Sequence, residues 1–158
     1  MPLIERVRHF LEVRQIPYNL TTHRRATRAS ELAYEEHLPA WEVAKTVVVY
    51  GDNKFLMIVV PSDRQVDLQE VRAALDLKHV RLASEVELSE LFPDCELGAM
   101  PPLGVLYGLA VYLDSDLASE SMMTFPAGTH QACVHMRTAD FQKLTDAKVF
   151  SLAMAARI

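Results

Sequence analysis

Two apolar segments separated by a short polar turn constrain the fold more than any other feature of this sequence. Residues 43–50 (VAKTVVVY) and 55–61 (FLMIVVP) are rich in β-branched side chains, and residues 51–54 (GDNK) between them contain Gly, Asp and Asn. Segments of this composition on either side of such a turn are typical of an antiparallel hairpin. The chain is therefore expected to contain at least one antiparallel pair of strands.

Periodic patterns on both sides of this hairpin predict a mixture of helices and further strands. Helices are expected over residues 3–15, 29–37, 67–76, 84–92 and 138–144. Strands are expected over residues 18–22, 79–83, 109–114, 121–125 and 132–136. Ser84 and Glu87 have the spacing of a capping box, and Thr138 is expected to cap the last helix. This order of elements predicts one α+β domain over residues 1–158, built on an antiparallel or mixed sheet.

The composition is that of a globular chain, because half of its 158 residues are apolar and 23% are charged. The apolar runs are too short to span a bilayer, and residues 1–10 lack the apolar core of a signal peptide. We therefore expect a cytoplasmic protein without membrane contact, in which Cys95 and Cys133 are reduced. The apolar residues 149–158 are expected to pack on the sheet or to form a dimer contact, so the chain is expected to be a monomer or a weak dimer.

The charge is unevenly distributed along the chain. The net charge of −5 argues against a non-specific nucleic-acid coat protein. Residues 1–28, however, contain six arginines and two glutamates, and Arg24, Arg25 and Arg28 lie close together. This cluster favours either a solvated approach to a helix or a local contact surface for a polyanion.

Lys45 stands within the first arm of the predicted hairpin. It lies either on a solvated face of an alternating strand or at the mouth of a pocket, where its ammonium group would hold a phosphate or a carboxyl-like oxygen. The glycine-rich pattern of a nucleotide-binding P-loop does not precede it.

Residues 125–136 (FPAGTHQACVHM) raise the question of a metal site. On a strand, Cys133 and His135 share one face, whereas His130 points the other way. Because no fourth ligand is evident nearby, we expect no metal and no other cofactor. His130 is instead expected at the entrance to a strand, either as a hydrogen-bonded structural residue or as a donor, acceptor or proton shuttle.

The sequence gives little support for a catalytic nucleophile. No GxSxG motif is present, and Cys95 follows Asp94, whose charge is expected to raise the pKa of the thiol and to leave it a packing residue. The segment 97–106 (LGAMPPLGVL) offers different chemistry. Gly98 lets the backbone approach a ligand closely, and Pro101 and Pro102 stiffen the loop, so its amides are suited to binding an oxyanion or positioning a water.

Three segments in this order resemble the YbaK/prolyl-tRNA synthetase-associated domain family. They are AKTVVV with its Lys45, GAMPP within residues 97–104, and FPAGTHQACVHMRTADFQKL. The resemblance extends over about residues 20–146. It implies the family's barrel-like sheet flanked by helices, and it implies an aminoacyl-tRNA deacylase that removes wrong amino acids in trans.

The resemblance also implies which residues form the site. Lys45, Gly98 and His130 are expected to carry the reaction, in which water attacks the ester without a metal and a hydroxyl of the terminal ribose assists. Further residues are expected to bind the substrate: Thr46, Ala99, Met100, Pro101, Pro102, Gly128 and Thr129. Arg24, Arg25 and Arg28 are weaker candidates for contact with the tRNA. Met100 and the prolines are expected to restrict which amino acid fits.

The expected partners are a mischarged aminoacyl-tRNA, bound by its 3′ end, and an aminoacyl-tRNA synthetase. Two positions depart from the family pattern: Thr46 stands where some relatives carry Asn or Ser, and Pro126 stands where relatives often carry a polar residue. They leave open a second function, a catalytically silent module of the same fold that binds an aminoacyl-tRNA, a nucleotide-like ligand or a synthetase.

Overall fold

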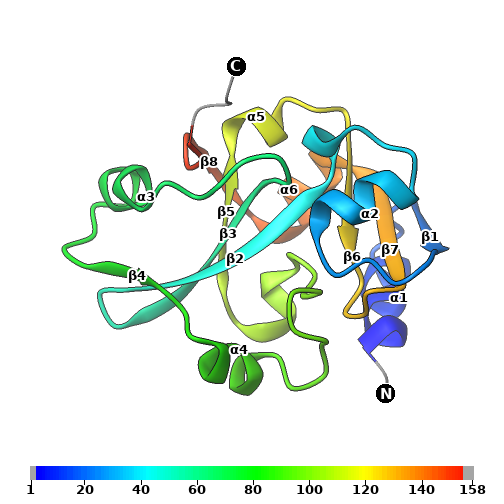
Figure 1. Ribbon diagram of the computed structural model, residues 1–158, viewed down its shortest axis with the longest axis horizontal. Helices are drawn as coiled ribbons and strands as arrows, with labels where there is room; N and C mark the ends of the chain where they lie inside the picture. The colour runs from blue at the N-terminus through cyan, green and yellow to red at the C-terminus, as the bar shows by residue number, and fades with distance from the viewer. Residues whose placement is uncertain (1–2, 155–158) are drawn as a thin grey trace.

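A computed structural model describes residues 3–154 (Figure 1). Its helices are α1 Leu3–Val13, α2 Ala29–Glu35, α3 Leu68–Ala74, α4 Glu85–Leu91, α5 Ser115–Ala118 and α6 Thr138–Thr145, with 3-10 turns η1 Ala40–Glu42 and η2 Gly104–Tyr107. Its strands are β1 Tyr18–Thr22, β2 Ala44–Gly51, β3 Lys54–Pro61, β4 Val80–Leu82, β5 Ala110–Asp114, β6 Met122–Pro126, β7 Ala132–Arg137 and β8 Lys148–Phe150. The predicted α+β class is confirmed.

The predicted hairpin forms the centre of a five-stranded mixed sheet with the order β4-β2-β3-β5-β8. β2 and β3 pair antiparallel, with Lys45 opposite Val60, whereas β5 pairs parallel to both β3 and β8. The turn is tighter than predicted, because the strands continue to Gly51 and resume at Lys54. Asp52 and Asn53 alone form the loop, both with positive φ, a conformation that these two residue types tolerate well.

The three remaining strands form a separate antiparallel sheet with the order β1-β7-β6. In the described residues, the barrel-like arrangement of this fold consists of two sheets flanked by helices, and neither sheet is closed. Between them the described residues make one isolated parallel bridge, from Val43 to Thr124. The physical reason is the short β4, which pairs only with Val49–Gly51 and leaves the first half of β2 with a free outer edge.

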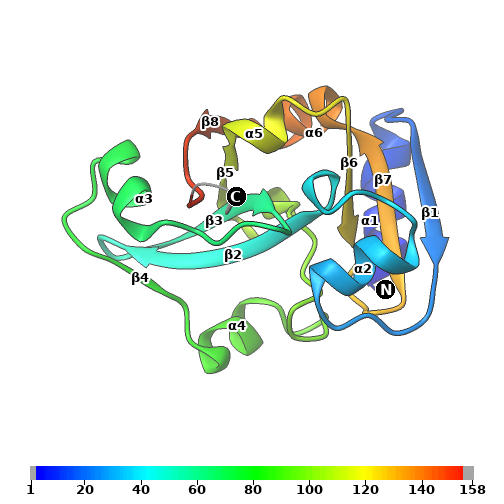
Figure 2. The ribbon, with the colours of Figure 1, turned by 45° about the horizontal axis from the view of Figure 1, so that its top comes forward.

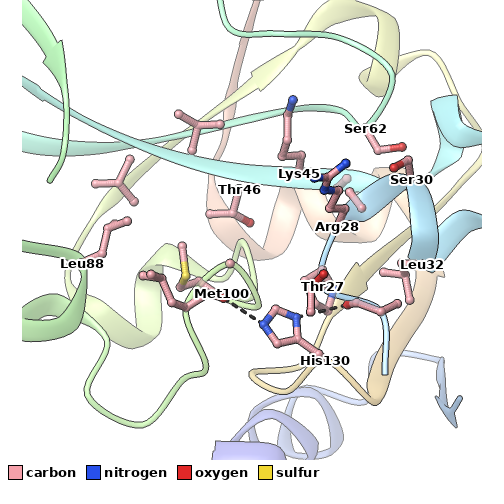
Figure 3. A pocket seen from close by; sticks show the side chains of 18 of the residues that line it. Thr27, Arg28, Ser30, Leu32, Lys45, Thr46, Ser62, Leu88, Met100 and His130 are labelled. Atoms are coloured by element: carbon pink, nitrogen blue, oxygen red, sulfur yellow. Dashed lines mark hydrogen bonds between the residues drawn. The ribbon is translucent and has the colours of Figure 1, made fainter. Parts of the chain in front are cut away.

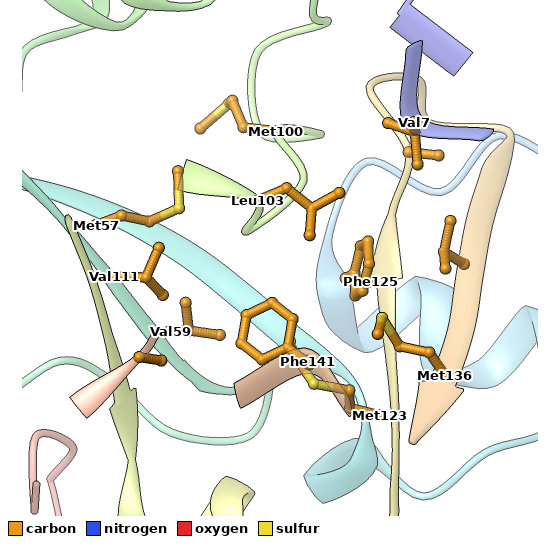
Figure 4. Close-up of a cluster of buried hydrophobic side chains, with 14 of the residues drawn as sticks. Val7, Met57, Val59, Met100, Leu103, Val111, Met123, Phe125, Met136 and Phe141 are labelled. Atoms are coloured by element: carbon orange, nitrogen blue, oxygen red, sulfur yellow. The ribbon is translucent and has the colours of Figure 1, made fainter. Parts of the chain in front are cut away.

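The main hydrophobic core fills the space between the two sheets. Val59, Leu103, Phe125, Met136 and Phe141 meet there with almost no exposed surface (Figure 4). The buried stripe of α1 closes this core beside β7, as its helical spacing predicts. A smaller cluster around α3 covers the other face of the five-stranded sheet.

The outer face of the three-stranded sheet is covered by α2 (Figure 2). Leu32 and Ala33 of this helix pack with the fully buried Cys133 of β7. The two ends of α2 consequently have different neighbours. The first residues of the helix face the five-stranded sheet, and its last turn lies over β1 and β7.

The start of α6 and the C-terminal segment differ in how well the sequence predicts them. The helix after β7 begins with Thr138 instead of being capped by it; Arg137 is the N-cap residue, and Thr138 Oγ1 is buried without a hydrogen-bond partner in the described part of the chain. The expectation that Thr138 caps this helix is therefore wrong. The apolar tail packs on the sheet, because β8 pairs with β5 and Leu152 is fully buried. Residues 155–158 of the tail lie outside the described residues.

The capping box predicted at Ser84 and Glu87 is confirmed, with both reciprocal hydrogen bonds present at the start of α4. Within residues 3–154, none of the helices has the length and apolar character that crossing a membrane requires.

Candidate functional site

A hollow of about 550 Å³ lies along the free edge of β2 (Figure 3). It is enclosed by the start of α2, the helix α4 and the loop that contains Gly98. Its lining residues are Ala26, Thr27, Arg28, Ala29, Ser30, Leu32, Ala44, Lys45, Thr46, Val47, Val48, Ser62, Leu82, Ala83, Glu85, Leu88, Leu97, Gly98, Met100, Pro126 and His130. The walls are mostly apolar, with a few hydroxyl, cationic and imidazole groups among them, which is the usual make-up of a small-ligand pocket.

The edge of β2 supplies backbone and hydroxyl groups to this pocket. On the outer side of β2, the carbonyl of Val48 accepts a hydrogen bond from Ala83 N at 2.9 Å. In an antiparallel strand the N–H and C=O of one residue point to the same side, and every second residue repeats that direction. Thr46 therefore presents its N–H and C=O to the same outer side of β2 as Val48. Its Oγ1 is buried and has no hydrogen-bond partner among residues 3–154. Thr46 is thus a polar position whose hydroxyl the described part of the chain leaves without a hydrogen-bond partner.

Lys45 lies at the rim of the pocket. Its Nζ donates a hydrogen bond of 2.5 Å to the carbonyl of Arg64 and points away from Met100 and His130 (Figure 3). Burial lowers the pKa of this half-buried ammonium group, and the nearby Asp63 carboxylate opposes the shift. Of the two sequence-based alternatives, the pocket mouth describes its position better than a solvated face.

The loop that carries Gly98 contributes one wall. Gly98 has a φ of +86°, and a Cβ placed on it would lie 3.6 Å from the His130 ring, so the backbone angle is the stronger reason for glycine here. Met100 lines the pocket, whereas Ala99, Pro101 and Pro102 are buried behind it. The amide of Ala99 donates to the carbonyl of Glu96 at 3.0 Å, so this one amide is already used within the loop.

His130 holds the same loop in place. Its Nε2 lies 2.9 Å from the carbonyl of Leu97, and its Nδ1 lies 3.2 Å from the carbonyl of Ala26. The ring is 7% exposed, and both of its nitrogens face backbone acceptors. The imidazole therefore connects the chain before α2 to the loop at Gly98. This geometry suits a structural connection better than proton transfer to a ligand.

The turn before His130 lies outside the pocket. Gly128 has a φ of +92° and packs under Leu3, where a Cβ would come within 2.1 Å of the leucine Cδ2. The Gly128 amide donates to the carbonyl of Ala99 at 2.8 Å, and Thr129 Oγ1 accepts from Gln131 N at 3.1 Å. These contacts position the loop, but neither residue lines the hollow.

The arginines gather at the entrance. Arg24, Arg25 and Arg28 are all exposed, and Arg28 is both a pocket-lining residue and the N-cap residue of α2. Arg25 forms a 2.7 Å ion pair with Glu96, next to the loop. They therefore place positive charge beside the opening, although Arg24 and Arg25 do not line it.

Sequence reasoning did not assign several pocket residues, among them Ser30, Ser62, Leu88 and Pro126. Ser62 Oγ donates a hydrogen bond of 2.6 Å to the carbonyl of Ala40. Ser30 and Leu88 reach the pocket because α2 and α4 pack against its rim, and Pro126 reaches it from the end of β6. The sequence predicts the two helices, but no local pattern in it indicates which face of either helix lines a cavity.

The two cysteines occupy different surroundings. Burial, together with the charge of Asp94, raises the pKa of the Cys95 thiol to about 11, which fits the expected packing residue. Burial and a hydrogen bond to Glu36 raise the pKa of the Cys133 thiol to about 12. Glu36 also lies beside His135, so the premise that no further ligand stands near Cys133 and His135 is wrong. The chain separation of about a hundred residues concealed this neighbour.

Comparisons with known proteins identify similar sequences and a similar fold. The sequence profile of the aminoacyl-tRNA editing domain matches residues 23–144. A stretch of 83 residues is 30% identical to proline–tRNA ligases of Bacillus cereus and Bacillus mycoides, which is 52% of this chain but only 14% of the length of those ligases.

Solved structures show the same fold. One, described as a candidate trans-editing enzyme for prolyl tRNA synthetase, superposes with a TM-score of 0.85 at 25% identity and covers 98% of this chain and 99% of its own. Another, a protein described only as hypothetical, has a TM-score of 0.86 at 20% identity over 94% of this chain and 99% of its own.

Proposed function

The chain belongs to the aminoacyl-tRNA editing domain family, and from this premise we propose that it hydrolyses the ester of mischarged aminoacyl-tRNA in the pocket along β2. The observation that carries the proposal is that Lys45, Thr46, Gly98 and Met100, four residues expected at the site from the sequence, line one hollow at an unpaired strand edge. The hollow is open to a 3′-terminal aminoacyl group, and exposed arginines lie at its entrance.

In the proposed reaction, water attacks the carbonyl carbon of the ester. The bond from that carbon to the ribose oxygen breaks, the ribose oxygen leaves with a proton, and the products are free amino acid and tRNA. Charge develops on the carbonyl oxygen, so donors fixed in advance lower the barrier most. The Thr46 hydroxyl and amide and the amide of Gly98 are the donors that we assign to this oxygen or to the attacking water.

Lys45 and His130 have separate roles in this proposal. The Lys45 ammonium, at the rim, holds the negatively charged or oxygen-rich part of the terminal adenosine as a point charge. His130 acts as a positioning residue, because its two nitrogens are directed at the carbonyls of Leu97 and Ala26. We propose that the reaction needs no metal at the pocket. Glu85 and His130 are the pocket-lining residues whose side chains are of a kind that binds metal ions.

The physical purpose of such a pocket is selection by size. A synthetase cannot strongly reject a smaller amino acid, since one methylene is worth only about 1–3 kcal/mol. A second pocket that admits the small residue and excludes the large one removes the error. Met100, Leu88 and Pro126 are the walls that we assign to this restriction.

The test is hydrolysis of a panel of chemically charged tRNAs. Ala, Ser, Cys and Thr are each placed on their own tRNA and on tRNA for proline, because the curated relatives are proline–tRNA ligases. Release of at least one amino acid well above the uncatalysed rate supports the proposal. The proposal fails if folded protein releases none of them.

Binding without release would point to the silent module instead. In that case an aminoacylated tRNA binds the protein with measurable affinity, yet its ester bond is not hydrolysed. Lys45→Ala would then change binding but not the rate of ester loss, which would equal the rate in buffer.

A further inference from the structure

A second group of chemically active side chains lies outside the pocket, between α2 and the three-stranded sheet. Cys133 and His135 project from the same face of β7, Thr21 comes from the neighbouring β1, and Glu36 follows the last residue of α2. We propose that Glu36, Cys133 and His135 bind one Zn²⁺ ion, with the hydroxyl of Thr21 next to the fourth position.

The arrangement is a compact tetrahedron of four heteroatoms. Cys133 Sγ and His135 Nε2 each lie 2.9 Å from Glu36 Oε1, and they lie 3.4 Å from one another. Thr21 Oγ1 lies 3.1 Å from the sulfur and 2.9 Å from Nε2, and it also contacts Glu36 Oε1. All six edges of the tetrahedron are therefore short contacts between atoms that can bind a metal.

Hydrogen bonds alone do not account for six such contacts. An ionised carboxylate brings no hydrogen, whereas the hydroxyl, the thiol and Nε2 bring at most one each. Three hydrogens cannot bridge six pairs, so at least three edges bring lone pairs together without a proton between them. A cation at the centre removes this repulsion. Ligand atoms around tetrahedral Zn²⁺ are separated by about 3.3–3.6 Å, so the side chains need to move outward by only a few tenths of an ångström.

The surroundings of His135 suit a metal ligand. Its other ring nitrogen, Nδ1, lies 2.7 Å from Thr124 Oγ1, the residue opposite it on β6. If Nδ1 carries the proton and donates to this hydroxyl, the lone pair of Nε2 points at Glu36 and Cys133. A second hydrogen bond that fixes the ring in this way is the usual companion of a metal-bound histidine.

The donor set indicates the kind of ion. One thiolate, one imidazole and one carboxylate oxygen in tetrahedral array are typical of Zn²⁺, whereas Mg²⁺ and Ca²⁺ prefer oxygen atoms alone. The thiol loses its proton to solvent as the ion binds. The side chains of Glu36 and His135 are 9% and 18% exposed, so the ion can reach the site from one side although Cys133 is buried.

The site would brace one wall of the pocket without belonging to it. Glu36 is the C-cap residue of α2, and the first turn of the same helix carries the pocket residues Ala29 and Ser30. The ion would tie the end of this short helix to β7. This inference does not depend on the proposed hydrolysis, since binding of the ion is measured directly.

The experiment uses the full chain, stripped of metal with a chelator and then mixed with Zn²⁺. We expect about one Zn²⁺ per chain after desalting, and a rise in Tm of about 5–10 °C at a free concentration one hundred times Kd. Co²⁺ is a spectroscopic probe of the same site. It should show the intense visible bands of tetrahedral geometry together with thiolate charge-transfer absorption.

Matched variants assign the ligands. Cys133→Ser should abolish the charge-transfer absorption, and His135→Gln and Glu36→Gln should each weaken Zn²⁺ binding about 10-fold or more. Cys95→Ser removes the other thiol and should change nothing. The proposal is overturned if wild-type chain retains no Zn²⁺, if it gives octahedral Co²⁺ spectra, or if the absorption follows Cys95. The wild-type measurements decide the matter even where a variant fails to fold.

Discussion

At the scale of single residues, the candidate site combines groups with very different conformational freedom. Lys45 keeps a long side chain at the rim, whereas Gly98 is fixed by its backbone angle and by the His130 ring behind it. Thr46 brings a hydroxyl that no described residue satisfies. Substitutions at these positions should therefore affect the reaction through different physical causes.

Gly98→Val tests the loop. A valine at a φ of +86° is strained by roughly 1–2 kcal/mol, and relief of that strain moves the neighbouring amides. A misplacement of catalytic groups by about 1 Å costs about 10²-fold in rate, so kcat/KM for ester hydrolysis should fall by about that factor. The measurement is single-turnover release of amino acid from the best ester of the panel.

Gly108→Val is the matched control. Gly108 has a comparable φ of +69°, no atom of residues 3–154 lies within 4 Å of a Cβ placed on it, and it does not line the pocket. Both variants should lose similar stability, but Gly108→Val should keep its rate within about threefold. Equal rates in the two variants would contradict the role given to the loop.

Lys45→Met tests the cation at the rim. Methionine keeps most of the side-chain volume and removes the charge, so hydrolysis should fall by about 10²-fold with little change in Tm. Lys54→Met, at the exposed start of β3 in the same hairpin, should leave the rate unchanged. An unaltered rate in Lys45→Met would remove Lys45 from the reaction.

At the scale of elements, α4 shows how a short helix is held at the pocket. Ser84 and Glu87 form the capping box, and Glu87 also receives two hydrogen bonds from Arg81 on β4, at 2.7 and 2.9 Å. The same helix presents Glu85 and Leu88 to the hollow. Its position therefore depends on a carboxylate that must stay ionised.

Glu87→Gln should reveal this dependence as a function of pH. The hydrogen bonds from Arg81, followed by that from Ser84, lower the pKa of Glu87 from 4.5 to about 2. The folded state thus holds the proton more weakly than the unfolded state. The stabilisation is present above pH 4.5 and is lost as the pH falls towards 2.

Melting curves across this range provide the measurement. Wild type should melt above Glu87→Gln near neutral pH, by a small margin because the pair is solvent-exposed, and the two should converge between pH 4.5 and 2. Glu90→Gln, exposed on the same helix, is the control and should follow wild type throughout. A gap that persists unchanged to pH 2 would contradict the assignment.

Elements with strong local signals could be predicted from the sequence, and those decided by tertiary pairing could not. The β2–β3 hairpin follows from its composition and its Asp52–Asn53 turn, and α4 follows from its capping box. By contrast, α5 has only four residues and is capped by the side chain of Asp114. β8 has three residues, which form a strand only because β5 offers them an edge to pair with. Neither has enough length for a periodic pattern.

At the scale of the whole molecule, the site depends on how the two sheets are placed. The free edge of β2 exists because β4 is short and because the three-stranded sheet contacts the chain at Val43 instead of extending along β2. The sequence pointed to Lys45, Gly98 and His130 through motifs, but the cavity walls from α2 and α4 depend on long-range packing. The neighbourhood of Glu36 and His135 was hidden for the same reason.

Binding of a non-hydrolysable substrate analogue tests the central claim most directly. The analogue is 3′-aminoacyl-adenosine with an amide in place of the ester, titrated into the labelled chain and followed through backbone amide NMR signals. We expect the largest shifts on Thr46, Gly98 and Met100. A second hollow of about 600 Å³ lies at the far end of the hairpin, beside Tyr50 and His79. Shifts confined to that end, or no shifts at saturating analogue, would contradict the account.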